Sequence, residues 1–125
     1  MAGITTSFGA QYKSYKEQRE KEIVNKLRSG VSKAGAIVER QAKINVSKSP
    51  PQHPQRQTSN LFNSIGFRVD MTGSEIAATV GTNVEYGGSL EFGNERHPPY
   101  PWLFPALELK KNEIKQAIEA GGGVF

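Results

Sequence analysis

The sequence predicts an α+β fold in which a long N-terminal helix and a C-terminal helix pack on a small antiparallel β-sheet, with a long loop after the first helix. Three observations predict this class. Apolar side chains recur at steps of three and four over residues 12–47, alternate with polar ones over residues 64–80, and return to helical spacing over residues 103–120. Helices that flank a hairpin, without alternating with its strands, are typical of α+β proteins.

The chain length predicts a single domain. With 125 residues the chain has room for one domain with one modest core, so we expect residues 1–125 to fold as a unit. The polar start, residues 1–10, and the glycine-rich end, residues 121–125, are expected to be flexible. Only 36% of the residues are hydrophobic, and burial of further surface in an oligomer would compensate for such a small core.

Residues 12–47 predict the first helix. One stripe of this segment carries the apolar side chains Ile23, Leu27, Val31, Ala34, Val38 and Ala42, and also Asn45. Gly30 and Gly35 each weaken a helix by up to about 1 kcal/mol relative to Ala. We therefore expect a break or a kink near residue 30.

Residues 47–60 predict a long loop. The segment contains three prolines, no aliphatic side chain and no periodicity. Loops of this length inside compact domains are uncommon and tend to be functional or disordered, so a contact with a partner and a flexible linker are both open interpretations.

The next segment predicts a hairpin. Thr58 or Ser59 can cap a short helical turn, after which alternate side chains are apolar on both sides of a turn at residues 72–74. One face of the hairpin is therefore apolar and must be covered. The apolar positions are Ile65, Phe67, Val69 and Met71 on the first strand and Ile76, Ala78 and Val80 on the second.

The remaining residues predict two helical segments around a proline cluster. Residues 84–92 can form a short helix or turn that packs Tyr86, Leu90 and Phe92 inward. The prolines of residues 97–101 require extended backbone, and Pro105 suits the first turn of a last helix over residues 103–120. Its buried side is expected to carry Leu107, Ile114, Ala117 and Ile118, with its lysines solvated.

The sequence offers little for catalysis. There is no cysteine, and neither His53 nor His97 has a second ligand at a metal-binding spacing, so we expect no metal, no cofactor and no enzyme. Glu85, Glu91 and Glu95 are interpreted as surface charges or subunit-contact charges. The chain has no apolar run long enough to span a membrane and no signal-peptide pattern, which predicts assembly in the cytoplasm without a membrane partner.

Charge is distributed unevenly along the chain. Residues 1–56 hold eleven Lys and Arg against four Asp and Glu, whereas residues 57–125 hold five against eight. Oppositely charged halves suit a head-to-tail contact between identical copies. A basic module that binds nucleic acid is the alternative from a different class, although the cations of the first helix are spread over several faces.

Four short motifs occur in a recognisable order: Thr58–Ile65 (TSNLFNSI), Val80–Tyr86 (VGTNVEY), Leu90–Gly93 (LEFG) and Pro101–Leu107 (PWLFPAL). Together they resemble the tail-completion, or head-to-tail joining, family of long-tailed bacteriophages, over roughly residues 31–120. The chain departs from the family where it has Thr58-Ser59 in place of Thr-Gly, Gly87 in place of alanine, and Asn94 near a usually basic or small residue. The motif positions with structural roles are Leu61, Ser64, Ile65, Gly81, Tyr86, Glu91, Phe92, Gly93, Pro101, Leu103, Pro105 and Leu107.

The resemblance implies a virion protein at the head–tail junction. Family members form a ring, commonly of six subunits, that caps the finished tail and docks on the connector below the portal, leaving a channel through which DNA passes without sequence-specific contact. Expected partners are other copies of the chain, a connector or stopper protein on the head side, and a tail-tube or terminator protein on the tail side. A tail terminator or another connector ring is the nearest alternative function.

A set of loop and helix residues is predicted to contact those partners. Deleting residues 50–57 is expected to leave the fold intact and to abolish joining. The predicted contact residues are Lys48, Pro50, Pro51, His53 and Arg56 in the loop, Arg40 and Lys43 on the basic helix, and Glu91 and Glu95 in the acidic cluster.

Overall fold

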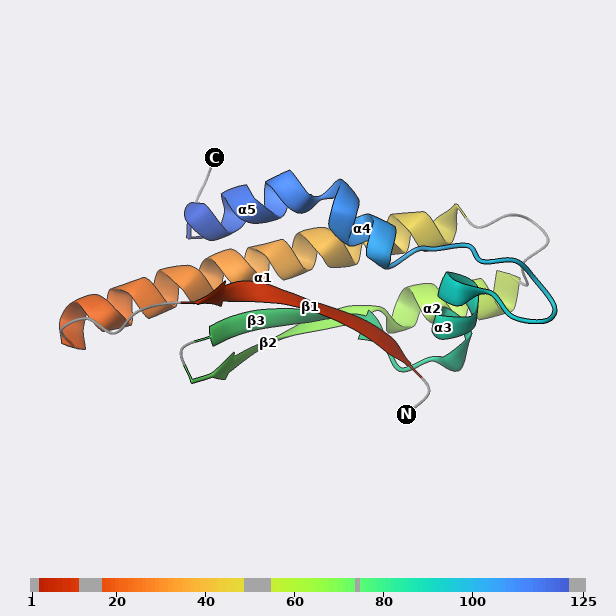
Figure 1. Cartoon of the computed structure of the whole chain (residues 1–125), viewed down its shortest axis with the longest axis horizontal. Helices are drawn as coiled ribbons and strands as arrows, with labels where there is room; N and C mark the ends of the chain where they lie inside the picture. The colour runs from red at the N-terminus through yellow and green to blue at the C-terminus, as the bar shows by residue number, and fades with distance from the viewer. Residues whose placement is uncertain (1–2, 12–16, 49–54, 74, 122–125) are drawn as a thin grey trace.

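The computed structural model describes residues 3–11, 17–48, 55–73 and 75–121, and it confirms the α+β class (Figure 1). A long helix lies against a small sheet, and the C-terminal helices lie along that same helix. In chain order the elements are β1 (Ile4–Gln11), α1 (Glu17–Ser47), α2 (Gln55–Ser64), β2 (Gly66–Thr72), β3 (Glu75–Thr82), α3 (Glu85–Phe92), α4 (Phe104–Leu109) and α5 (Lys111–Glu119).

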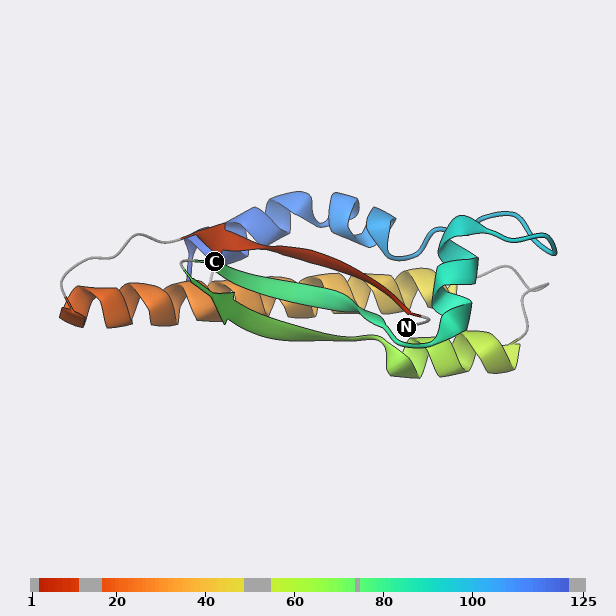
Figure 2. The same ribbon diagram turned by 60° about the horizontal axis from the view of Figure 1, so that its bottom comes forward.

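The sheet has three strands in the order β1-β3-β2, and both outer strands run antiparallel to β3. In β3 the side chains alternate as predicted, with Ile76, Ala78 and Val80 buried beneath α1. Ala78 pairs with Val69 of β2 and with Phe8 of β1, so these side chains share the covered face. The predicted hairpin is confirmed, and the opposite face of the sheet carries none of the described helices (Figure 2).

The core lies where α1 meets the sheet and α5. Val31, Ala34, Val38 and Ala42 of the predicted stripe are fully buried, and Ala117 of α5 packs against the same core. Burying a valine or leucine side chain stabilises a fold by about 1.5–3 kcal/mol. Trp102 and Leu103, both fully buried, close the core near the end of α1 and belong to the same cluster.

The predicted break near residue 30 is wrong, because α1 is continuous from Glu17 to Ser47. Gly30 is buried at the crossing with α5, where a Cβ atom would lie 2.7 Å from the carbonyl oxygen of Ala117 and 2.8 Å from the Cα of Ile118. The glycine therefore permits close approach of two helix backbones.

The expectation of a flexible start over residues 1–10 is also wrong, since Ile4–Gln11 forms an edge strand. Isoleucine, threonine and phenylalanine favour strands, and pairing with β3 supplies the backbone hydrogen bonds that an isolated segment lacks. At the other end Gly121 caps the last turn with a φ of 63°, and residues 122–125 lie outside the described part of the chain.

Two further boundaries differ from the prediction. The expected loop over residues 47–60 is shorter, because α2 already begins at Gln55 and extends well beyond a single turn. The last helix is divided at Lys110, whose φ of −99° and ψ of 11° end α4 and begin α5. A deletion of residues 50–57 would thus remove the start of α2, so it cannot test the loop alone.

Candidate assembly surface at the α3–α4 corner

Glu91 holds the corner between α3 and α4. Its side chain is only 3% exposed, and its Oε1 accepts hydrogen bonds from the backbone N–H groups of Trp102 (2.8 Å) and Leu103 (2.7 Å). Its Oε2 accepts a third from Phe104 (3.3 Å). These donors stand at the start of α4, where a negative charge is favourable and where Leu103 offers no capping side chain. The expectation that Glu91 is a surface or subunit-contact charge is therefore wrong.

Side chains from α1 and α3 fix the segment that precedes α4. The indole Nε1 of Trp102 donates to the carbonyl of Gly87 (2.9 Å), and Asn45 Nδ2 donates to the carbonyl of Trp102 (3.0 Å). Asn45 in turn accepts from Gln41 Nε2 at 2.9 Å. Gly87 stands where the family that the motifs resemble usually has alanine. In this chain a Cβ atom at that position would be crowded by the side chains of Thr82 and Trp102.

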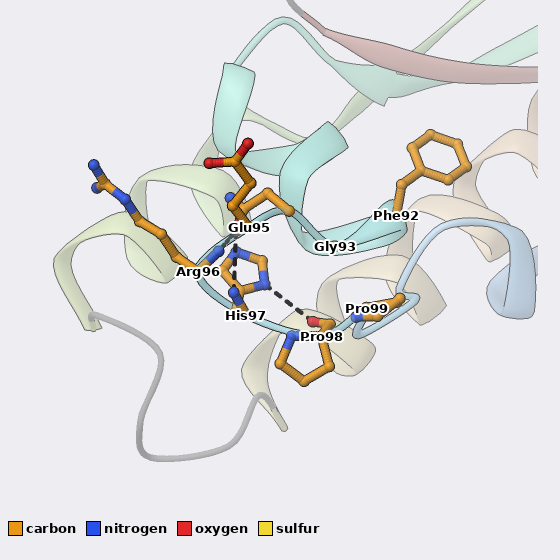
Figure 3. Close-up of a pocket in the computed structure, with 8 residues that line it drawn as sticks. Phe92, Gly93, Glu95, Arg96, His97, Pro98 and Pro99 are labelled. Atoms are coloured by element: carbon orange, nitrogen blue, oxygen red, sulfur yellow. Dashed lines mark hydrogen bonds between the residues drawn. The ribbon is translucent and has the colours of Figure 1, made fainter.

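The loop between the two helices is closed by its own hydrogen bonds. Gly93 adopts a φ of 78°, a conformation that favours glycine, and its N–H caps α3 through the carbonyl of Ser89 (2.8 Å). Asn94 Oδ1 accepts from the N–H groups of Arg96 (2.8 Å) and His97 (3.1 Å). Figure 3 shows the resulting hollow, of about 500 Å³, lined by Phe92 to Pro99.

Tyr86 lies under this loop. Its ring meets the ring of His97 edge-on at 6.3 Å, and its hydroxyl is buried without a hydrogen-bond partner among the described residues. Burial raises the pKa of the Tyr86 hydroxyl above its usual value of 10.0. An unsatisfied buried hydroxyl costs about 1–3 kcal/mol.

The aromatic side chains beside the buried carboxylate point outward. Phe92 was predicted to pack inward, yet it is 63% exposed, because the neighbouring position on α3 turns Glu91 towards the interior. Its ring lies 5.9 Å from that of Phe104, which is 40% exposed, and Leu109 at the end of α4 is 65% exposed. Phe92 and Phe104 therefore form an apolar pair that the described residues leave uncovered.

The other motif positions have roles inside the fold. Ser64 at the end of α2 hydrogen bonds to Thr82 at the end of β3, and Thr82 also accepts from the N–H of Val84 (3.0 Å). Gly81 lets β1 approach, since a Cβ atom there would clash with Ile4 and Thr5. Leu61 and Ile65 are buried, Leu107 is half-buried, Pro101 is exposed, and Pro105 stands in the first turn of α4 as predicted.

The predicted contact residues are only partly brought together. Arg40 and Lys43 lie in the last turns of α1, and Lys48 directly follows the helix. Lys43 also faces Glu39 (3.6 Å) and the ring of Phe62 (5.5 Å). Glu95 is exposed in the α3–α4 loop. Pro50, Pro51 and His53 lie outside the described residues, and Arg56 is in the first turn of α2. Their contacts with partners stay a prediction.

Within the described residues no group of three His, Asp or Glu side chains is placed to hold a metal ion. No described helix is both long enough and apolar enough to cross a membrane. Glu91, Asn45 and Asn94 hold the chain's own backbone at the α3–α4 corner, while Phe92 and Phe104 face outward. An exposed apolar pair on a corner held in this way is typical of a structural subunit that contacts other proteins.

Comparison with known protein families agrees with that class. Residues 10–93 match the family described as "Bacteriophage HK97-gp10, putative tail-component". The chain belongs to this HK97-gp10-like family, and it is accordingly a structural protein of the phage virion and not an enzyme. No curated protein and no solved structure matches the chain. The fourth resembling motif, Pro101–Leu107, lies beyond the matched residues.

Proposed function

We propose that the chain is the subunit of a homo-oligomeric ring, commonly of six copies, that completes the tail and joins it to the head. The ring docks between a connector or stopper protein on the head side and a tail-tube or terminator protein on the tail side. Its lumen lets genomic DNA pass without reading its sequence. Membership of a phage tail family supports this proposal.

The observation that carries the proposal is the uncovered apolar surface of the α3–α4 corner. Phe92 and Phe104 are large hydrophobic side chains that a monomer exposes side by side, and an exposed apolar patch is typical of a protein–protein contact. The uneven charge of the two halves of the chain suits a contact with an identical copy.

Electron microscopy of lysates from the phage with this gene disrupted tests whether the protein acts in joining the head to the tail or in terminating the tail. Separate DNA-filled heads beside finished tails of normal length are the expected result. Tails of uncontrolled length would instead make the protein a terminator. Intact infectious particles would overturn the structural proposal and favour the DNA-binding alternative, whose binding should weaken steeply with salt.

A surface variant tests the contact itself. Phe92→Ser should change the free energy of unfolding by no more than about 0.5 kcal/mol, because the side chain is mostly exposed. It should lower the yield of joined particles at least tenfold, measured as phage titre after complementation of the disrupted gene. The matched control is Lys111→Ser at an exposed position on α5, which should complement fully. Equal titres for the two variants would contradict the contact.

A further inference from the structure

The outer strand β1 is an unprotected edge. Its eight residues contain no charged side chain and no proline, and among the described strands it pairs only with β3. Proteins normally guard such an edge with charges, prolines or bulges, because its free N–H and C=O groups pair readily with another chain. An edge strand without these guards is typical of one that is paired in the assembled protein.

The opposite edge of the sheet offers a place for such a strand. Beside β2 an open groove of about 700 Å³ runs along α1, and its lining combines polar and cationic side chains with Ala36 and the ring of Phe67: Asn25, Arg28, Ser29, Ser32 and Lys33. A strand added to β2 would place its inward side chains over this groove. Ile4 and Phe8 of β1 lie on the covered face and pack against the core of their own copy, and both are only half-buried there, as expected at an edge that a further strand can join.

We propose that β1 of one copy pairs with β2 of the next copy, so that the three-stranded sheets join into a continuous ring. The inference rests on the proposed ring and names the contact that closes it. The strands match in length, with eight residues in β1 and seven in β2. Because each copy carries both edges, the contact is head-to-tail and can repeat until it closes.

The topology also sets the direction of the joint. Both β1 and β2 run antiparallel to β3, so they are parallel to each other within a subunit. Rotation about a ring axis keeps that sense, which makes the new pair parallel. Pairing of β1 with β1 of a second copy about a twofold axis would be antiparallel and would stop at two copies.

Engineered disulfides test this joint, and the absence of native cysteine makes the test clean. Thr5 and Ser7 on β1 and Arg68 and Asp70 on β2 are exposed on the open face of the sheet. Four double variants combine Thr5→Cys or Ser7→Cys with Arg68→Cys or Asp70→Cys in the full-length chain. At least one pair should form, on mild oxidation, a covalent ladder that ends at the ring size given by native mass spectrometry.

Controls separate this joint from other contacts. Ser7→Cys with Glu119→Cys, at an exposed position on α5, should give no ladder. A covalent dimer from Ser7→Cys alone, rings in which all four pairs stay uncross-linked, or a purified chain that stays monomeric without cross-links would each overturn the strand joint. Failure of the proposed function would appear separately, as intact particles in the microscopy of the disrupted phage.

Discussion

The α1–α5 crossing and the α3–α4 corner are stabilised by different interactions. At the crossing, small residues such as Gly30, Ala34 and Ala117 bring two backbones together. At the corner a buried carboxylate, Glu91, joins the buried Trp102 and Leu103, while its neighbour Phe92 faces solvent. The crossing is stabilised by close packing. The corner also depends on hydrogen bonds that Glu91 accepts from backbone N–H groups that have no partner within the helix.

The largest effect is expected at the corner. Glu91→Ala would leave the buried N–H groups of Trp102 and Leu103 without acceptors, which should lower the free energy of unfolding by roughly 3 kcal/mol. Denaturant unfolding measures the loss. Glu95→Ala is the matched control, because Glu95 is exposed in the adjoining loop and should change stability by less than about 0.5 kcal/mol. Similar losses for the two variants would refute the capping role.

A smaller change in the free energy of unfolding is expected at the crossing. Helix propensity alone would predict that replacing a glycine there by alanine stabilises the fold, and we expect the opposite. Gly30→Ala should destabilise by about 1 kcal/mol, since the overpacking against α5 exceeds the gain of up to about 1 kcal/mol from alanine in a helix. Gly88→Ala in α3 meets nothing within 4 Å and should stabilise by about 0.5–1 kcal/mol. Thermal unfolding of both variants measures the contrast, and a stabilising Gly30→Ala would show that the helices can move apart.

The smallest change in stability is expected at Tyr86, which lies under the loop of the corner. Tyr86→Phe removes a buried hydroxyl without a partner and should stabilise by up to about 1 kcal/mol at neutral pH. Because burial raises the pKa of Tyr86 in the folded state, the wild type should lose further stability relative to the variant as the pH rises above about 10. Urea unfolding at pH 7 and pH 10.5 measures this difference, and an equal gap at both values would disprove burial as the cause.

Sequence periodicity predicted the part of the fold that depends on apolar packing. The stripe from Val31 to Ala42 and the alternation from Ile76 to Val80 are both buried as expected, because a helix and a strand each repeat at a fixed spacing. Strand β1 was missed, since a short polar segment forms a strand only with the partner β3 beside it. Propensity alone does not reveal such pairing.

The corner was predicted only in its motif positions. Leu103 and Pro105 were correctly assigned to a helix start, whereas the burial of Glu91 was not foreseen. A carboxylate is buried here because three backbone donors converge on it from a segment ten or more residues away. No local pattern records that convergence, although the start of a helix without a capping side chain is a signal that an acceptor must come from elsewhere.

The Glu91 contacts also fix the position of the exposed aromatic pair. One side chain ties the end of α3 to the start of α4, so the rings of Phe92 and Phe104 are held as a pair before any partner arrives. Each flexible side chain that must be ordered on association costs about 0.5–1.5 kcal/mol, and here that ordering has already occurred during folding. In the proposed assembly each subunit would therefore reach the growing particle with this aromatic pair already positioned.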